Sequence, residues 1–206
     1  SGTTDWKLSN VATNNEIAGY GDATSINIGQ ALNLKISLAQ AGQYNLDVYR
    51  LGYYNGKGGR LIASVAGLNE ATQAGPTITN ASTKLVEYKW TTSYILQSHK
   101  DWTTGLYMVK LTDCGTGKQN YIQFVLRDDN RPADLGFQDA ITTAAAYNNN
   151  GGYSVYDFNS IGGTRAYQVS FDRPFQYGAD VCSEQFNNML TWEYNMTRWL
   201  ESQSYD

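Results

Sequence analysis

Charged residues are scarce in this sequence. They make up 17% of its 206 residues, with 15 Lys and Arg against 19 Asp and Glu. A chain with so few cations and a net charge of −4 has little with which to neutralise phosphates, so we expect no nucleic-acid partner. Long apolar runs are also missing, because none approaches the roughly 20 residues that a membrane-spanning helix needs. The sequence therefore predicts no transmembrane segment.

Histidine and cysteine are nearly absent as well. The one histidine, His99, lies in the polar stretch 93–102 without a second imidazole or a thiolate nearby, so we assign it no catalytic role. No Gly-x-Ser-x-Gly nucleophile elbow and no Cys–His pairing occurs, so no catalytic residue is assigned. The two cysteines, Cys114 and Cys182, can form one disulfide in an oxidising compartment or stay as separate thiols.

Aromatic and small residues are abundant instead, with 16 Tyr, 5 Trp and 20 Gly. Together with many Ser, Thr and Asn residues, this composition is typical of extracellular β proteins. Asn80 and Asn195 each begin an N-glycosylation acceptor triplet, and Asn195 is the poorer candidate because it falls in a predicted helix. The first residue, Ser1, fits either a processed mature form or an artificially chosen start of the chain. We therefore expect a secreted protein, or one on the extracellular surface, that carries glycans.

The first 130 residues show the alternation of apolar and polar residues that is typical of half-buried strands. The predicted strands are 25–28, 31–38, 44–51, 60–65, 84–90, 105–111 and 120–127. Strands at this spacing predict a mainly β fold, an immunoglobulin- or fibronectin-III-like antiparallel β-sandwich over residues 1–130. Its predicted core residues are Leu34, Ile36, Leu46, Val48, Leu106, Val109, Ile122 and Phe124.

Charge and a proline at 128–132 mark a boundary, after which residues 131–206 predict an incomplete α/β segment. We expect a short buried strand at 135–138, a short helix or turn at 140–147, a loop at 148–152 and a C-terminal amphipathic helix at 184–202, capped by Ser183. The apolar residues of this helix recur in steps of three and four, and they are Phe186, Met189, Leu190, Trp192, Met196, Trp199 and Leu200. Because the set is too broad for one contact, we expect two packing surfaces, with Trp192 and Trp199 as interface anchors.

Five motifs are spread over most of the chain. They are Asp47–Tyr54, Tyr121–Asp129, Ala146–Asn149 with the glycine pair at 151–152, Asp172–Phe175, and Trp192–Tyr194 with Arg198–Glu201. Together they resemble the large-subunit family of N,N-dimethylformamidase, in the region where its sandwich joins its α/β catalytic domain. The sequence departs from the family pattern at Asn150, where a tryptophan is usual, and at Phe171, where a tyrosine is usual.

Enzymes of that family hydrolyse a small amide with a mononuclear iron held by two tyrosines and one glutamate. The resemblance implies Tyr147, in the Ala-Tyr-Asn-Asn motif, as one metal ligand and Tyr194 as the other. The His-Asp-Glu-Tyr-Trp stretch that carries the family's glutamate ligand does not occur in these 206 residues. We therefore expect no cofactor in this chain, and iron only if the enzyme hypothesis holds.

Three functions remain open. The favoured hypothesis is a non-catalytic β-sandwich protein that self-associates into a homo-oligomer or polymer, such as a surface layer or filament. The second is a fragment of an iron-dependent amide (C–N) hydrolase. The third is a carbohydrate-binding module, in which surface tyrosines and tryptophans stack on sugars.

Overall fold

The computed structural model describes residues 1–133, 135–175 and 189–205. Its strands are β1 (Ile17–Gly21), β2 (Ser25–Asn27), β3 (Ala31–Leu38), β4 (Gly42–Leu51), β5 (Gly59–Glu70), β6 (Thr77–Asn80), β7 (Leu85–Glu87), β8 (Tyr94–Gln97), β9 (Gly105–Asp113) and β10 (Gln119–Arg127). Its helical segments are η1 (Tyr54–Gly56), α1 (Ile141–Tyr147), η2 (Asp157–Asn159), η3 (Ile161–Gly163), the π-helical turn η4 (Met189–Glu193) and α2 (Tyr194–Ser202).

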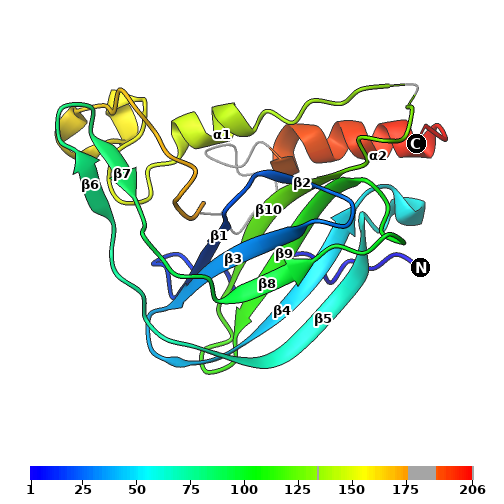
Figure 1. The fold of residues 1–206 in the computed structure, drawn as a ribbon, viewed down its shortest axis with the longest axis horizontal. Coiled ribbons are helices and arrows are strands. Elements are labelled where there is room, and N and C mark those ends of the chain that lie inside the picture. Colours follow the sequence, from blue (N-terminus) through cyan, green and yellow to red (C-terminus); the bar gives the residue numbers. More distant parts are fainter. Residues whose placement is uncertain (134, 176–188, 206) are drawn as a thin grey trace.

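Two sheets form a sandwich, as Figure 1 shows. One sheet has the strand order β2-β10-β9-β4-β5 and the other the order β1-β3-β8, while β6 and β7 pair as a separate hairpin. All pairings are antiparallel except that between β2 and β10. The predicted mainly β, antiparallel sandwich is therefore confirmed.

Short strands with weak sequence signals were missed. β8 lies inside the stretch predicted as a polar loop, where a four-residue edge strand carries too little alternation to be recognised. β1 contains two glycines, which are unfavourable strand formers. A Cβ on Gly19 would come within 2.6 Å of Ile122 Cδ1, so close packing of β1 against β10 explains one of them.

The predicted core residues are all buried, but they do not all lie in the same core. Val109 faces the space between the two sheets, whereas Leu106 joins a second cluster on the outer side of the five-stranded sheet. Strand β9 is covered on both faces, so its apolar residues do not alternate with polar ones. The assignment of Leu106 to the sandwich core was therefore wrong.

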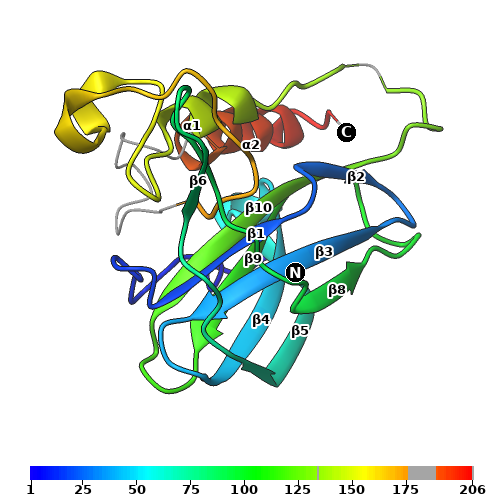
Figure 2. The ribbon, with the colours of Figure 1, turned by 60° about the vertical axis from the view of Figure 1, so that its left-hand side comes forward.

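The C-terminal segment supplies the cover for that outer face. Figures 1 and 2 show α1 and α2 together on one side of the sandwich. Leu190 and Tyr194 pack into the second cluster with Tyr49, Met108 and Tyr121 of the sheet. This packing confirms that one face of the predicted terminal helix is buried against the sandwich.

Other predictions for residues 131–206 had mixed outcomes. The helix expected at 140–147 is α1. The buried strand expected at 135–138 is wrong, because these residues form no strand and Leu135 and Phe137 are 47% and 44% exposed. The terminal helix is confirmed over 189–202, while its predicted cap Ser183 and its residue Phe186 lie outside the described residues. The division of the chain at residue 130 stays a prediction.

Within the described ranges, no helix has both the length and the apolar character to cross a bilayer.

Candidate functional site

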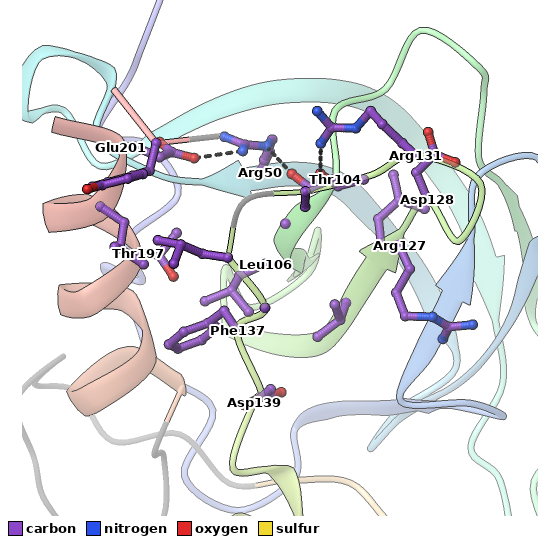
Figure 3. A pocket seen from close by; sticks show the side chains of 18 residues that line it. Arg50, Thr104, Leu106, Arg127, Asp128, Arg131, Phe137, Asp139, Thr197 and Glu201 are labelled. Atoms are coloured by element: carbon purple, nitrogen blue, oxygen red, sulfur yellow. Dashed lines mark hydrogen bonds and ion pairs between the residues drawn. The ribbon is translucent and has the colours of Figure 1, made fainter. Parts of the chain in front are cut away.

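A partly buried ion pair fastens α2 to the sandwich. The Nη2 atom of Arg50, on β4, lies 2.6 Å from Glu201 Oε1, on α2. Arg50 also donates from Nε to the Thr104 carbonyl, at 2.9 Å, and from Nη1 to the Tyr54 hydroxyl, at 2.8 Å. Glu201 Oε2 accepts the Tyr53 backbone N–H at 2.7 Å. Figure 3 shows Arg50 reaching toward Glu201 and Thr104. Charge-assisted bonds of this kind hold both side chains in fixed positions.

Glycines make this close approach possible. A Cβ on Gly52 would overlap the Glu201 carboxylate, and a Cβ on Gly58 would overlap the Tyr194 hydroxyl. Gly58 also has a φ of +85°, which side-chain-bearing residues rarely adopt. The glycine-rich loop after β4 therefore lets α2 lie directly on the sandwich. The first and last of the five motifs meet at this contact.

A pocket of about 330 Å³ lies beside the ion pair, between the sandwich, the linker 128–139 and α2. Its apolar wall includes Leu106, Val125, Leu126, Phe137 and Leu200. Its charged groups include Arg50, Asp128, Arg131, Asp139 and Glu201. We call it the junction pocket. Apolar walls with a few charged groups are typical of small-molecule sites.

Asp139, which lines the junction pocket, has the Glu193 carboxylate near it. Burial raises the pKa of Asp139 to about 6, and the negative charge of Glu193 adds to this shift. Glu193 is 5% exposed, and its Oε1 accepts the Ala140 backbone N–H at 3.2 Å. Its Oε2 has no hydrogen-bond partner among the described residues. A pocket carboxyl with a pKa near neutrality can both take up and release a proton.

The two tyrosines implied as metal ligands lie in different aromatic clusters. The ring of Tyr147 stacks on that of Tyr156, with centroids 4.2 Å apart. Tyr194 is buried, and its ring lies 5.0 Å from that of Trp6. No group of three His, Cys, Asp or Glu residues that could hold a metal occurs in the described ranges. The two tyrosines thus have different ring neighbours, and their role as metal ligands stays a prediction.

The Ala-Tyr-Asn-Asn motif and the Asp-Arg-Pro-Phe motif instead build a buried hydrogen-bond network. Asn148 Nδ2 donates to the Pro174 carbonyl at 3.1 Å. Tyr88, which follows β7 and packs with Tyr20 of β1, donates its hydroxyl to Asn150 Oδ1 at 2.6 Å. Arg173 donates from Nη2 to the Asn150 carbonyl, and its burial lowers its pKa to about 10. The sequence departure at Asn150 thus ties this segment to the sandwich.

The remaining predicted sites lie at the surface or outside the described ranges. Cys114 is exposed and Cys182 is not among the described residues, so the disulfide stays a prediction. Asn80 and Asn195 are both exposed, and their glycosylation stays a prediction too. Asn195 donates its side-chain amide to the Thr191 carbonyl at 2.7 Å within the helix.

The predicted interface tryptophans share an exposed stripe. Trp192 is 71%, Met196 49% and Trp199 56% exposed, and their spacing of four and three residues places them on one face of the helix. We call these three residues the tryptophan stripe. The predicted second contact of the helix therefore stays a prediction.

Some residues of the junction were not singled out from the sequence. Arg50 lies in the first motif and Glu201 in the last. Membership of these motifs could have marked both residues as candidates for the site. No sequence pattern indicated that Asp139 and Glu193 lie near each other, because 54 positions separate them. Only the docking of α2 brings Glu193 to the neighbour of Asp139.

Comparisons with known proteins give one family. A family model described as N,N-dimethylformamidase beta subunit-like, C-terminal, matches residues 45–206. No curated protein matches the chain. Among solved structures, one similar chain comes from a study of T cell specificity and activation by the bacterial superantigen toxic shock syndrome toxin-1. It is 10% identical, the match covers 54% of this chain and 98% of that chain, and its TM-score of 0.30 is too low to carry an argument.

Proposed function

This chain belongs to the N,N-dimethylformamidase beta subunit-like family, and we propose that it forms part of a small-amide hydrolase whose substrate enters the junction pocket. One observation carries the proposal: residues of three motifs, among them Arg50, Arg127 and Glu201, line a single pocket where the sandwich meets the C-terminal segment. A pocket of about 330 Å³ suits a small molecule rather than a polymer.

The walls of the pocket fit an amide chemically. Leu106 and Phe137 offer apolar contact to the alkyl groups of a small amide, and the ends of β9 and β10 exclude water from one side. The Asp139 carboxyl accepts a hydrogen bond from an amide N–H or a proton from water, as its raised pKa allows. No step is assigned to iron, because the role of Tyr147 and Tyr194 as metal ligands stays a prediction.

The proposal is tested by ligand-observed NMR with formamide, acetamide and N,N-dimethylformamide. Replacing Thr197, which lines the pocket from α2, by tryptophan fills the pocket, and we expect amide binding to be lost. Asn195→Trp is the matched control, since Asn195 is exposed on the same helix and does not line the pocket. Equal binding by Thr197→Trp and the unaltered protein would contradict the proposal. Hydrolysis is then measured directly, as release of ammonia from formamide or acetamide and of dimethylamine from N,N-dimethylformamide.

A second candidate function is self-association through the tryptophan stripe. Monomeric proteins rarely expose several large apolar side chains together, and an isologous or heterologous contact between copies would cover them. Exposed acceptors at Asn80 and Asn195, with the aromatic and polar composition, support the further proposal of an extracellular glycoprotein. The mass of the native particle tests self-association, and a monomer of 22.8 kDa would contradict it.

A further inference from the structure

Two tyrosine rings stack where α1 ends. Tyr147 is the last residue of α1, and Tyr156 directly precedes η2. Their ring centroids are 4.2 Å apart and their planes differ by 24°. In the part of the chain that the structure describes, this is the shortest separation between aromatic rings and the one ring contact that joins two tyrosines. We call Tyr147 and Tyr156 the tyrosine pair.

Two hydrogen bonds close to the rings hold the tyrosine pair in place. The backbone N–H of Val155, the neighbour of Tyr156, donates to the carbonyl of Ala146, the neighbour of Tyr147, at 3.0 Å. Asn159 donates its side-chain amide to the Tyr147 carbonyl, also at 3.0 Å. The backbone is thus tied together directly beside both residues. The fold therefore keeps the two rings in contact, as a reaction between them requires.

The phenol groups of the tyrosine pair also meet. The Tyr156 hydroxyl is hydrogen-bonded to that of Tyr147, and this bond raises the pKa of Tyr156. In stacked rings whose hydroxyls meet, the ring carbons beside the hydroxyls face each other, and phenoxyl radicals couple at these carbons. Both residues are only half-buried, and Phe158, whose ring lies beside both, is 75% exposed. The tyrosine pair is therefore accessible from solvent.

We infer that the tyrosine pair is a site of oxidative cross-linking, at which a haem peroxidase with hydrogen peroxide joins the two rings as dityrosine. The site goes beyond the proposed amide hydrolysis and does not depend on it. Each phenol gives one electron and its hydroxyl proton to the oxidised haem. The two phenoxyl radicals then form one carbon–carbon bond between positions ortho to the hydroxyls. Each of these carbons passes its hydrogen, as a proton, to the adjacent oxygen, so the chain loses two hydrogen atoms while hydrogen peroxide is reduced to two waters.

The stacked geometry favours this link over links between separate molecules. Tyrosines on two molecules must first collide in the right orientation, whereas the tyrosine pair is already in contact. The exposed Tyr167 instead has the Arg165 guanidinium over its ring, with no tyrosine ring beside it in the described ranges. The new bond closes the loop 147–156, and closing a loop stabilises a fold by restricting its unfolded state.

The test treats dilute whole chain with a haem peroxidase and an equimolar amount of hydrogen peroxide. We expect dityrosine fluorescence, an intact mass lower by two hydrogen atoms and a higher melting temperature. Chymotryptic cleavage after Tyr153, which lies between the two residues, should leave their peptides joined. Tyr147→Phe and Tyr156→Phe keep the stacked rings but each lacks one hydroxyl, so each should lower the yield of the link about tenfold or more. Tyr167→Phe, the matched control, should leave the yield unchanged.

Three outcomes overturn the inference. One is an equal yield of dityrosine from the unaltered protein and from both variants. Another is a link that mass spectrometry places at other tyrosines or between chains. The third is no link under conditions that couple free N-acetyltyrosine. Circular dichroism confirms that the variants are folded. Amide binding is recorded before peroxide is added, so failure of one proposal is distinguishable from failure of the other.

Discussion

At the scale of single residues, glycines and one arginine decide how the C-terminal segment meets the sandwich. Gly52 leaves the space that the Glu201 carboxylate occupies, and that carboxylate pairs with Arg50 at 2.6 Å. The side chains of Arg50 and Glu201 are 11% and 20% exposed, so the pair is shielded from solvent and salt more than a surface pair is. A side chain at position 52, or loss of the charge on Arg50 or Glu201, should therefore weaken the docking of α2 on the sandwich.

Gly52→Ala should lower the free energy of unfolding by about 2–3 kcal/mol, because the new Cβ forces Glu201 away from a largely buried arginine. Urea denaturation followed by tryptophan fluorescence measures the change. Gly75→Ala is the matched control, since a Cβ there meets nothing within 4 Å. An effect no larger than that of Gly75→Ala would show that α2 is not held through this contact.

Tyr147→Phe should leave the metal content of the purified protein unchanged. The Tyr147 hydroxyl is hydrogen-bonded to Tyr156, which raises the pKa of Tyr156, and Tyr194 lies in another cluster. Elemental analysis of the unaltered and the substituted protein measures iron. Stoichiometric iron that disappears with Tyr147→Phe would restore the iron-site hypothesis.

At the scale of elements, the terminal helix has two apolar faces in different environments. Leu190 and Tyr194 are buried on the sheet, whereas the tryptophan stripe is exposed. Apolar residues this widely distributed around a helix are typical of a helix that is covered on more than one side. Single exposed apolar side chains are also common on protein surfaces, so exposure alone does not show that a partner binds.

Trp199→Glu should reduce particle size without loss of β structure if the tryptophan stripe joins copies of the chain. Dynamic light scattering gives the size and circular dichroism the sheet content. Truncating a large aromatic side chain at the centre of an interface typically costs about 2 kcal/mol or more of binding energy. Gln43→Glu controls for the added charge, because Gln43 is exposed on β4 and is not part of the helix. Unchanged size with intact sheet removes the tryptophan stripe from any interface.

At the scale of the whole molecule, the sandwich buries many tyrosine hydroxyls. Burial raises the pKa of Tyr20, Tyr44 and Tyr49 to about 12 each, from an ordinary value near 10. Between pH 10 and 12 the folded chain therefore holds more protons than the unfolded chain. These groups contribute their full stability below pH 10, and it is lost as the pH rises through 12.

Alkaline titration followed at 295 nm should show that fewer tyrosines ionise near pH 10 in the folded protein than in 6 M guanidinium. The urea midpoint should fall between pH 10 and 12, as the unfolded state alone releases its phenolic protons. If all 16 tyrosines ionised near pH 10 in the folded protein, the tyrosine burial described for the sandwich would be wrong.

The sequence predicted much of this architecture because strands with one buried face show an alternation of apolar and polar residues. The predicted bounds 31–38 coincide with β3, and the core positions Leu34, Leu46 and Phe124 are fully buried or nearly so. The five motifs likewise identified the family, which the match over residues 45–206 confirms. Both results depend on local patterns, which a linear sequence carries directly.

The junction was decided only by the tertiary structure. Leu106 faces the C-terminal segment because both faces of β9 are covered. When both faces of a strand are buried, the sequence pattern does not show which face each apolar residue occupies. Arg50 and Glu201 are 151 positions apart, and the Glu193 carboxylate binds the neighbour of Asp139 only after α2 has docked on the sandwich. Local periodicity therefore determined the longer strands and the terminal helix, but not the short strands β1 and β8. The pocket, the ion pair and the approach of Glu193 to Asp139 depend on long-range packing, which brings together side chains that the sequence keeps apart.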